Sequence, residues 1–432
     1  MKKIVRKYAL TTALAVVVII SMTLSIVLWS NPSYKQTQNS NPSRSDLTEK
    51  TLASLYMPNQ AIYTGKNGKQ WLALNSTVNV IGEVHKRLSK YHYDHIRRIS
   101  YGSNSKYFKY LHRQRSIALN YQNNITFNLL KRIVNDHVKT SSDRRINRII
   151  VPTNHHRFIY LLCDSNRAVY KVNVKHRSLT GLRSIVKRSL RKIPVRVISM
   201  NRTPIVEFKR SVSMPRYEYL INRQTKNYDI MHLLNNAQKI GSVKHRHYTA
   251  YNNGSDRQLR FDHYQDVTYI NDHQVNLHHH FDRTLMTSYH NLLGLNLPLT
   301  GIHYFESNPR NQTVVYRDFV ENFPVFNPTQ LGLLSVKYLK HSVHYNYSLE
   351  SLQIPLPDGR KDVRLPSTRQ ILTKLKKHGF NLRKIQAIEL GYRWQNARPS
   401  KDLANLTPSW FIEYHHRWIS YRQLLKNLSV NS

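Results

Sequence analysis

The stretch RFIYLLCDSNRAVYKVNV, residues 157–174, indicates which class of fold this sequence adopts. Its first part is a short apolar run, and in its second part Tyr170, Val172 and Val174 alternate with more polar positions. Both patterns are typical of β-strands. The segment Asp164–Arg167 between them has the composition of a turn. The stretch therefore predicts two strands joined by a turn.

The patterns on either side of this stretch extend the prediction to a mixed fold. We expect strands at 116–130, 217–222, 247–251, 259–264 and 267–272, a hairpin at 304–319, and one long strand at 333–349. We expect helices at 78–88, 178–191, 228–236, 281–293 and 367–379. Helices and strands alternate irregularly and Gly-rich strand-to-helix turns do not occur, which favours the α+β class over a doubly wound sheet.

Two local patterns predict individual contacts. Ser367 and Gln370 have the spacing of a capping box at the start of a helix. In PSWFIEYHHRWISY, residues 408–421, apolar positions alternate as on one face of a strand, with Trp410 directed into a core. The pair His415-His416 would then form a turn into a return strand.

Residues 9–29, ALTTALAVVVIISMTLSIVLW, contain no charged side chain. At about 1.5 Å per residue, a helix of this length spans the hydrocarbon core of a bilayer. The run is longer than a typical secretory signal and lacks a small-x-small site, so we expect a retained anchor, with a cleaved signal peptide as the alternative. The topology determinants are the preceding basic residues, which favour a cytoplasmic N-terminus: Lys2, Lys3, Arg6 and Lys7. We therefore expect a single-pass protein of the cell membrane with most of the chain outside the cell.

Changes in composition divide the chain further. A segment rich in Ser, Asn, Pro and Gln follows the anchor, and proline-containing breaks occur near residues 194 and 298. The predicted organisation is a cytoplasmic basic tail at 1–7, a transmembrane anchor at 8–29, a flexible stalk at 30–50, and three α/β domains at 51–194, 195–298 and 299–432.

The net charge of +42, from 66 Lys and Arg against 24 Asp and Glu, is extreme. Nucleic-acid binding is one interpretation. The basic residues are scattered, however, and no nucleic-acid motif accompanies them. Together with the predicted anchor, this favours contact with anionic lipid or wall polymers over nucleic acid.

No sequence motif of a catalytic or cofactor site occurs: there is no G-x-S-x-G, H-E-x-x-H, P-loop or G-x-G-x-x-G. Adjacent histidines such as His278–His280 would point to opposite faces of a strand, which disfavours a metal site. The scarce carboxylates indicate no pair for glycoside hydrolysis. The single cysteine, Cys163, lies in an apolar strand pattern and reads as a buried structural thiol. We expect no catalytic, cofactor-binding or metal-binding residues.

Three stretches, taken in order, resemble the YycH family of accessory regulators. The first is the anchor ending SIVLWSNPSY with LYMPNQAIYT (55–64) after the stalk, the second is VVYRDFVENFPVFN (314–327), and the third is ELGYRWQ (389–395) with LTPSWFIEYHHRWISY (406–421). The resemblance covers essentially the whole chain.

The resemblance implies one transmembrane helix and an extracellular part of three α/β domains, the later ones β-rich and similar to YycI. It also implies a non-enzymatic role in a two-component system that controls cell-wall metabolism in Gram-positive bacteria. The implied partners are the WalK (YycG) sensor histidine kinase and a YycI-like protein. The strong basicity departs from what the resemblance alone would suggest.

A candidate contact face in the anchor consists of four small or hydroxyl-bearing residues: Thr11, Ala15, Ser21 and Ser25. They fall within about 120° of one another on a helix, and small residues let membrane helices approach closely. Two other functions stay open at this point. One is a binding module for anionic wall polymers such as teichoic acid, with no kinase role. The other is a cell-wall hydrolase.

Overall fold

The structure is a computed structural model. It describes residues 52–74, 79–134, 144–154, 157–175, 184, 192–234, 240–272, 280–327, 329, 332–356, 362–396 and 400–428. All of them belong to one compact unit, Thr51–Ser432. Among these residues, no helix has both the length and the apolar character needed to cross a bilayer. The predicted tail, anchor and stalk lie outside the described residues, as does the predicted helix at 178–191 apart from Ser184.

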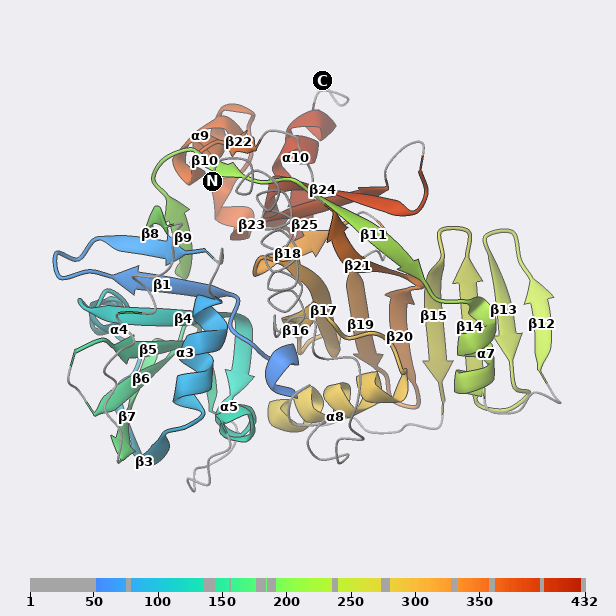
Figure 1. The fold of residues 1–432 in the computed structure, drawn as a ribbon, viewed down its shortest axis with the longest axis horizontal. Coiled ribbons are helices and arrows are strands. Elements are labelled where there is room, and N and C mark those ends of the chain that lie inside the picture. The colour runs from blue at the N-terminus through green and yellow to red at the C-terminus, as the bar shows by residue number, and fades with distance from the viewer. Residues whose placement is uncertain are drawn as a thin grey trace, which may run out of the picture. The chain divides into compact units, whose positions relative to one another are not determined.

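The first half of this unit builds a nine-stranded sheet with the strand order β3-β7-β6-β5-β4-β1-β2-β8-β9 (Figure 1). Neighbouring strands pair in the antiparallel sense. The strands are β1 (Gln60–Thr64), β2 (Gln70–Ala73), β3 (His92–Ser100), β4 (Ser116–Thr126), β5 (Arg145–Pro152), β6 (Phe158–Cys163), β7 (Ala168–Lys175), β8 (Lys192–Met200) and β9 (Thr203–Phe208).

Helices cover both faces of this sheet. On one face lie α3 (Val80–Leu88) and α5 (Phe127–Val134), and on the other lies α4 (Asn104–Leu111). Strand β5 illustrates the consequence: Ile149 and Val151 pack in the core that contains α3 and α5, whereas Ile150 packs in the core that contains α4. A sheet covered on both faces needs continuous apolar strands, and β5 has that pattern.

The second half builds a fourteen-stranded sheet within the described residues. Along its main path the order is β12-β13-β14-β15-β20-β19-β17-β18-β23-β24-β11-β21, with β16 on β17 and β25 on β24. The strands are β11 (Tyr217–Arg223), β12 (Gly241–Lys244), β13 (Tyr248–Asn252), β14 (Arg257–Asp262), β15 (Asp266–Asn271), β16 (Ile302–Asn308), β17 (Thr313–Val320), β18 (Phe323–Phe326), β19 (Leu333–Tyr338), β20 (Val343–Ser348), β21 (Glu350–Leu356), β23 (Ile385–Asn396), β24 (Leu403–Tyr414) and β25 (Arg417–Ser420). A separate two-stranded sheet pairs β10 (Val212–Met214) with β22 (Val363–Leu365).

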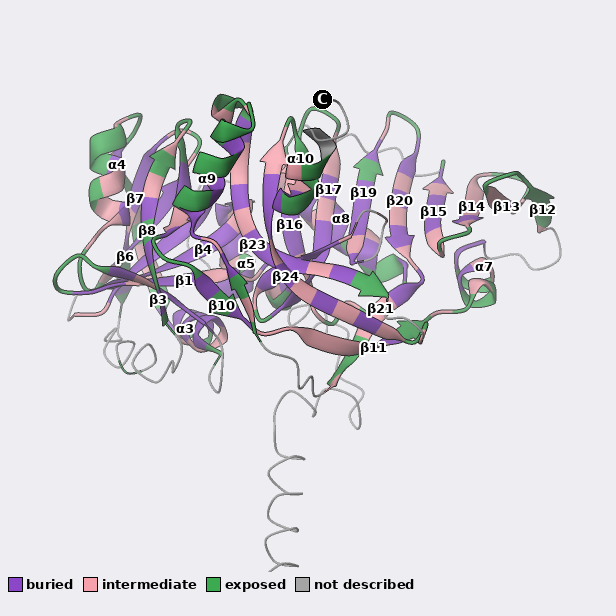
Figure 2. Cartoon of the chain, turned by 90° about the horizontal axis from the view of Figure 1, so that it is seen from above, coloured by how far each residue is buried: buried purple, intermediate pink, exposed green. Residues whose placement is uncertain are grey.

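The remaining helices pack around this sheet. They are α7 (Lys226–Leu234), α8 (Phe281–Gly294), α9 (Thr368–Lys377), the 3-10 helix η2 (Leu382–Lys384) and α10 (Tyr421–Leu428). Figure 2 shows mainly buried strands, with exposed outer surfaces on α4, α9 and α10. Helix α8 contacts α5 and β4 of the first half, and its residues Leu285 and Tyr289 share one core with both sheets. The three predicted domain ranges stay a prediction.

Several local predictions are confirmed, as is the α+β class. Ser367 caps α9 in a capping box with Gln370, and the turn at 164–167 joins β6 to β7. Trp410 is buried on β24. His415 and His416 have φ angles of 50° and 61° and form the two-residue turn between β24 and β25, as primed hairpin turns require.

Two predictions are wrong in their boundaries. The segment 116–130 is not one strand, because β4 ends at Thr126 and α5 begins at Phe127; the Thr126 side chain accepts a hydrogen bond from the Leu129 N–H, as a helix cap does. The segment 333–349 is two strands, β19 and β20, because a turn closes between Leu339 and Ser342.

Candidate functional site

The stretches 55–64, 314–327 and 406–421 are far apart in the sequence and meet in the structure. The Tyr56 hydroxyl donates to the Leu285 carbonyl at 2.8 Å and lies 2.8 Å from the Tyr316 hydroxyl. Because the Tyr56 proton is used on Leu285, Tyr316 donates to Tyr56, and Ser288, at 2.7 Å, donates to Tyr316. Burial raises the pKa of both tyrosines, so these hydroxyls stay neutral. The first and second stretches are thus joined by a buried chain of hydroxyl groups.

Aromatic packing joins the second stretch to the third. Phe326 stacks on Phe411 with a centroid separation of 4.0 Å and an interplanar angle of 21°. Trp418 packs against Phe326 and against Phe305. We call the set Tyr56, Phe305, Tyr316, Arg317, Phe326, Phe411 and Trp418 the motif junction.

Arg317 places a buried charge inside this packing. Its guanidinium carbon lies 4.5 Å from the ring centroid of Phe326 and 4.9 Å from that of Phe305. Its Nη1 donates to the Val325 carbonyl at 3.4 Å, and its Nε has no partner among the described residues. Burial lowers the pKa of Arg317 to about 10, so it stays charged at neutral pH. Aromatic faces, which attract cations, surround the guanidinium, and the Glu306 carboxylate also favours its charged form.

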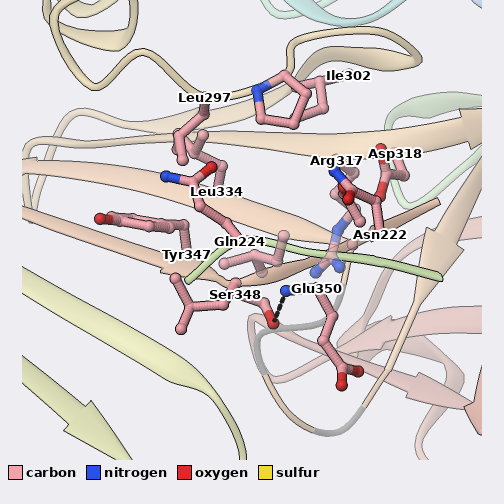
Figure 3. Close-up of a pocket in the computed structure, with 15 residues that line it drawn as sticks. Asn222, Gln224, Leu297, Ile302, Arg317, Asp318, Leu334, Tyr347, Ser348 and Glu350 are labelled. Atoms are coloured by element: carbon pink, nitrogen blue, oxygen red, sulfur yellow. Dashed lines mark hydrogen bonds between the residues drawn. The ribbon is translucent and has the colours of Figure 1, made fainter. Parts of the chain in front are cut away.

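Asp318 follows Arg317 and lies at the same pocket (Figure 3). The cavity is about 40 Å³, with Arg317 and Asp318 at one end and Tyr347 at the other. The Asp318 carboxylate has no hydrogen bond or ion pair within the described part of the chain, and burial raises its pKa to about 7. Gly301 and Gly332, with φ angles of 79° and 68°, leave space next to its oxygens.

The size of this pocket limits what it can do. A volume of about 40 Å³ holds a few water molecules and no substrate. The chemistry available at the motif junction is therefore a fixed buried charge on Arg317 and a carboxyl group on Asp318 that titrates near neutral pH. The sequence signal for Asp318 is an acid inside the apolar strand pattern VVYRDFV, residues 314–320.

The site residues predicted from the sequence lie elsewhere. The candidate contact face (Thr11, Ala15, Ser21, Ser25) and the topology determinants (Lys2, Lys3, Arg6, Lys7) are outside the described residues and stay predictions. Across the described ranges, no group of three or more His, Cys, Asp or Glu side chains is arranged to hold a metal ion. Cys163 is buried, as predicted, with its Sγ 3.2 Å from the Ser165 hydroxyl.

Comparison with known proteins gives the family. The description "YycH protein, N-terminal domain" matches residues 9–190, and "YycH protein, C-terminal domain" matches residues 208–426. The crystal structure of YycH from Bacillus subtilis is similar, with a TM-score of 0.69 and 14% identity, covering 86% of this chain and 96% of that one. An uncharacterized protein from Eubacterium rectale has a TM-score of 0.30 and 11% identity, covering 52% of this chain and 85% of that one. No curated protein matches the sequence.

The chain therefore belongs to the YycH family. The predicted resemblance is confirmed, and the fold agrees with that of the Bacillus subtilis protein. YycH proteins are regulatory accessory proteins of two-component signalling and are not known as enzymes, so this chain is a YycH-type regulator.

Proposed function

We propose that this chain is a membrane-anchored, non-catalytic regulator of a WalK-type (YycG-type) sensor histidine kinase. In this proposal it acts together with a YycI-like protein, in the control of cell-wall metabolism, with most of the chain outside the cell. Its membership of the YycH family, matched over residues 9–190 and 208–426, is the observation that carries the proposal. A regulator of this kind shifts a kinase between signalling states by binding one state better than the other.

The motif junction supports such a role physically. It joins Tyr56, just beyond the predicted stalk, to Tyr316, 260 positions later, through buried hydroxyl groups. Packed interiors transmit displacement because they have low compressibility. A displacement at the surface of the folded part can therefore reach the segment that leads to the membrane. This transmission needs no catalytic groups.

The proposal is tested with the full-length chain crosslinked in its native membrane. Ala15→Leu combined with Ser25→Leu fills the candidate contact face while keeping the anchor apolar. We expect it to reduce the recovery of the sensor kinase about fivefold or more, since close approach of membrane helices requires small residues. Val17→Leu with Ile20→Leu, on a different side of the helix, is the matched control and should leave recovery unchanged.

Two outcomes would count against the proposal. Equal recovery of the kinase with both double variants would show that the candidate contact face does not bind the kinase. The interaction would then be assigned to other residues. Failure to recover any sensor kinase with the unmodified chain would overturn the regulatory role itself.

The net charge of +42 favours a second candidate function, an extracellular module for anionic wall polymers. Binding of this kind depends on salt, because exposed charges are screened over about 8 Å at physiological ionic strength. Affinity of the full-length chain for purified teichoic acid should then fall steeply between low and high salt. A loss of polymer binding that leaves kinase output unchanged would identify this function as separate from regulation.

A further inference from the structure

A second and much larger cavity, of about 420 Å³, lies between the nine-stranded sheet and strands β23 and β24. One wall comes from β1, β4, β5 and β9, and the other from the faces of β23 and β24. Strand β9 contacts β23, and the two lie close together in Figure 1. The volume is about ten times that of the pocket at Asp318 and falls in the range of small-molecule sites, about 300–1,000 Å³. We call it the amide-lined cleft.

The lining of this cleft is unusual in composition. Nine of its lining residues are Asn or Gln, and Tyr121 is the one aromatic residue among them. Small-molecule pockets are mostly apolar with a few polar groups, so this cleft has the reverse character. Each side-chain amide offers two donors and one acceptor oxygen. Such a surface suits a ligand that carries hydrogen-bonding groups on all sides.

Strand β4 supplies buried polar atoms that have no protein partner. Its pairing with β5 shifts register between Asn120 and Ile125, so the chain bulges where it lines the cleft. Residues Asn120 and Tyr121 are buried, with 4% and 5% of their surface exposed. Neither the Asn120 Oδ1 nor the Tyr121 hydroxyl has a hydrogen-bond partner among the described residues. Buried polar groups are almost always paired, so these atoms indicate a missing partner at this wall.

Two carboxyl groups face the cleft from the opposite wall. Ala387 pairs with Glu413 across β23 and β24, which makes Glu389 and Glu413 diagonal neighbours on the same face. Such positions lie about 7–8 Å apart. Gln60 Nε2 donates to Glu389 Oε2 at 3.2 Å. Burial raises the pKa of both glutamates to about 7.

The charges of the cleft argue against an anionic ligand. The buried cation Arg148 is held by Asp164, with Nη2 and Nε each 2.8 Å from a carboxylate oxygen, while its Nη1 has no hydrogen-bond partner among the described residues. Glu389 and Glu413 would repel added negative charge. The cleft therefore offers unpaired polar atoms on β4 and one unpaired donor on Arg148, which suit uncharged groups that both donate and accept, such as hydroxyls.

We infer that the amide-lined cleft binds an uncharged oligosaccharide, through the hydroxyl and amide groups of its sugar units. A sugar presents hydrogen-bonding groups around each ring, which matches amide side chains on both walls and the unpaired acceptors on β4. A peptide would instead need apolar pockets for its side chains, and the lining is mainly polar. This inference goes beyond the proposed regulatory function and does not depend on it.

The test measures binding of defined saccharides to the full-length chain in lipid nanodiscs, because maltoside detergents carry sugar head groups that would compete. Chitotetraose and cellotetraose are the probes, with tetraalanine as the peptide control. We expect saturable binding of at least one saccharide, detected by saturation-transfer NMR and titration calorimetry. Glu389→Gln keeps the shape of the side chain but changes an acceptor into a donor, and it should raise Kd at least tenfold.

A second variant and a control keep the test decisive. Asn123→Ala removes a part-exposed amide from the cleft wall and should also weaken binding, while Glu83→Gln on α3, outside the cleft, should not. Near-UV circular dichroism and thermal midpoints check that each variant is folded. Binding of neither saccharide, binding of tetraalanine alone, or binding that neither Glu389→Gln nor Asn123→Ala weakens would each overturn the inference. No kinase is present, so failure here leaves the regulatory proposal standing.

Discussion

The motif junction and the amide-lined cleft contain acids with the same shifted pKa in opposite surroundings. Burial raises the pKa of Asp318 beside the junction and of Glu389 in the cleft to about 7. Asp318 faces a small pocket of about 40 Å³ and has no hydrogen-bond partner for its carboxylate in the described structure. Glu389 faces the amide-lined cleft, whose volume is about 420 Å³, and accepts a hydrogen bond from Gln60. A raised pKa alone therefore does not identify a binding site; the space and the donors around the acid do.

The largest expected effect is at the aromatic packing of the junction. Phe326→Ala removes the stacking on Phe411 and the contacts with Phe305 and Arg317. Truncating a buried aromatic typically destabilises by about 3–5 kcal/mol. Urea denaturation of the full-length chain should show this loss, while Asn123→Ala in the cleft should stay within about 1 kcal/mol of the unmodified chain. If both variants lost the same free energy of unfolding, the motif junction would contribute no more to stability than the wall of the cleft.

The next effect concerns Asp318 and depends on pH. Its pKa is about 7 in the folded chain and near 3.8 ordinarily, so the folded state holds the proton more tightly than the unfolded state. The contribution of Asp318 to the free energy of unfolding therefore falls as pH rises from about 4 to 7 and levels off above that. Asp318→Asn removes this penalty and should be more stable than the unmodified chain at pH 8, by at most about 4 kcal/mol, and nearly equal at pH 4.

Denaturation midpoints at pH 4, 6 and 8 measure this difference. Glu207→Gln, which removes a part-exposed acid on β9, is the matched control. An Asp318→Asn variant that loses stability at pH 8 would show that the carboxylate is held by a favourable contact rather than destabilised by burial.

A smaller effect is expected from Glu389→Gln. The direction is the same as for Asp318, because burial raises the pKa of both acids, but Glu389 is open to the cleft and hydrogen-bonded by Gln60. The pKa of Glu389 rises from 4.5 to about 7, a smaller rise than that of Asp318 from 3.8 to about 7. The gain at pH 8 should therefore be smaller than for Asp318→Asn, at most about 3 kcal/mol. A gain at pH 8 larger than that of Asp318→Asn would show that burial costs the Glu389 carboxylate more than the Asp318 carboxylate.

The smallest effect is expected from chelator and reductant. The described residues place no cluster of metal-binding side chains, and Cys163 is the chain's single cysteine. The thermal midpoint of the full-length chain should be unchanged by either reagent. A drop of several degrees with chelator would mean that an ion contributes to one of the two regions or to the histidine runs.

The parts of the fold that the sequence predicted are those encoded by local chemistry. The capping box of Ser367 and Gln370 and the two-residue turn at His415-His416 depend on neighbours only, and both are present. The turn between Leu339 and Ser342 contains no Gly or Pro to mark it, which is why 333–349 was predicted as one strand. At β4, the Thr126 cap was present in the sequence but was hidden within a continuing apolar pattern.

The candidate sites were beyond such reasoning because they are assembled from distant segments. The motif junction joins residues near 56, 316 and 411, and the amide-lined cleft brings residues near 60, 121 and 389 together. Nothing in the local pattern around Glu389 distinguishes it from an exposed glutamate on a strand. Its raised pKa arises only when β23 is placed against the wall formed by the first sheet.

The position of β11 has a consequence for how the chain is made. This strand lies between β24 and β21 in the sheet, yet it precedes both in the sequence. A nascent chain must therefore carry residues 217–223 with both edges unpaired until residues 350–356 and 403–414 have been synthesised. Pairings between such distant segments form slowly and leave strand edges open to association with other chains. A ribosome that stops before Leu403 would release a protein whose first half can close its own sheet, but whose second half still exposes one edge of β11.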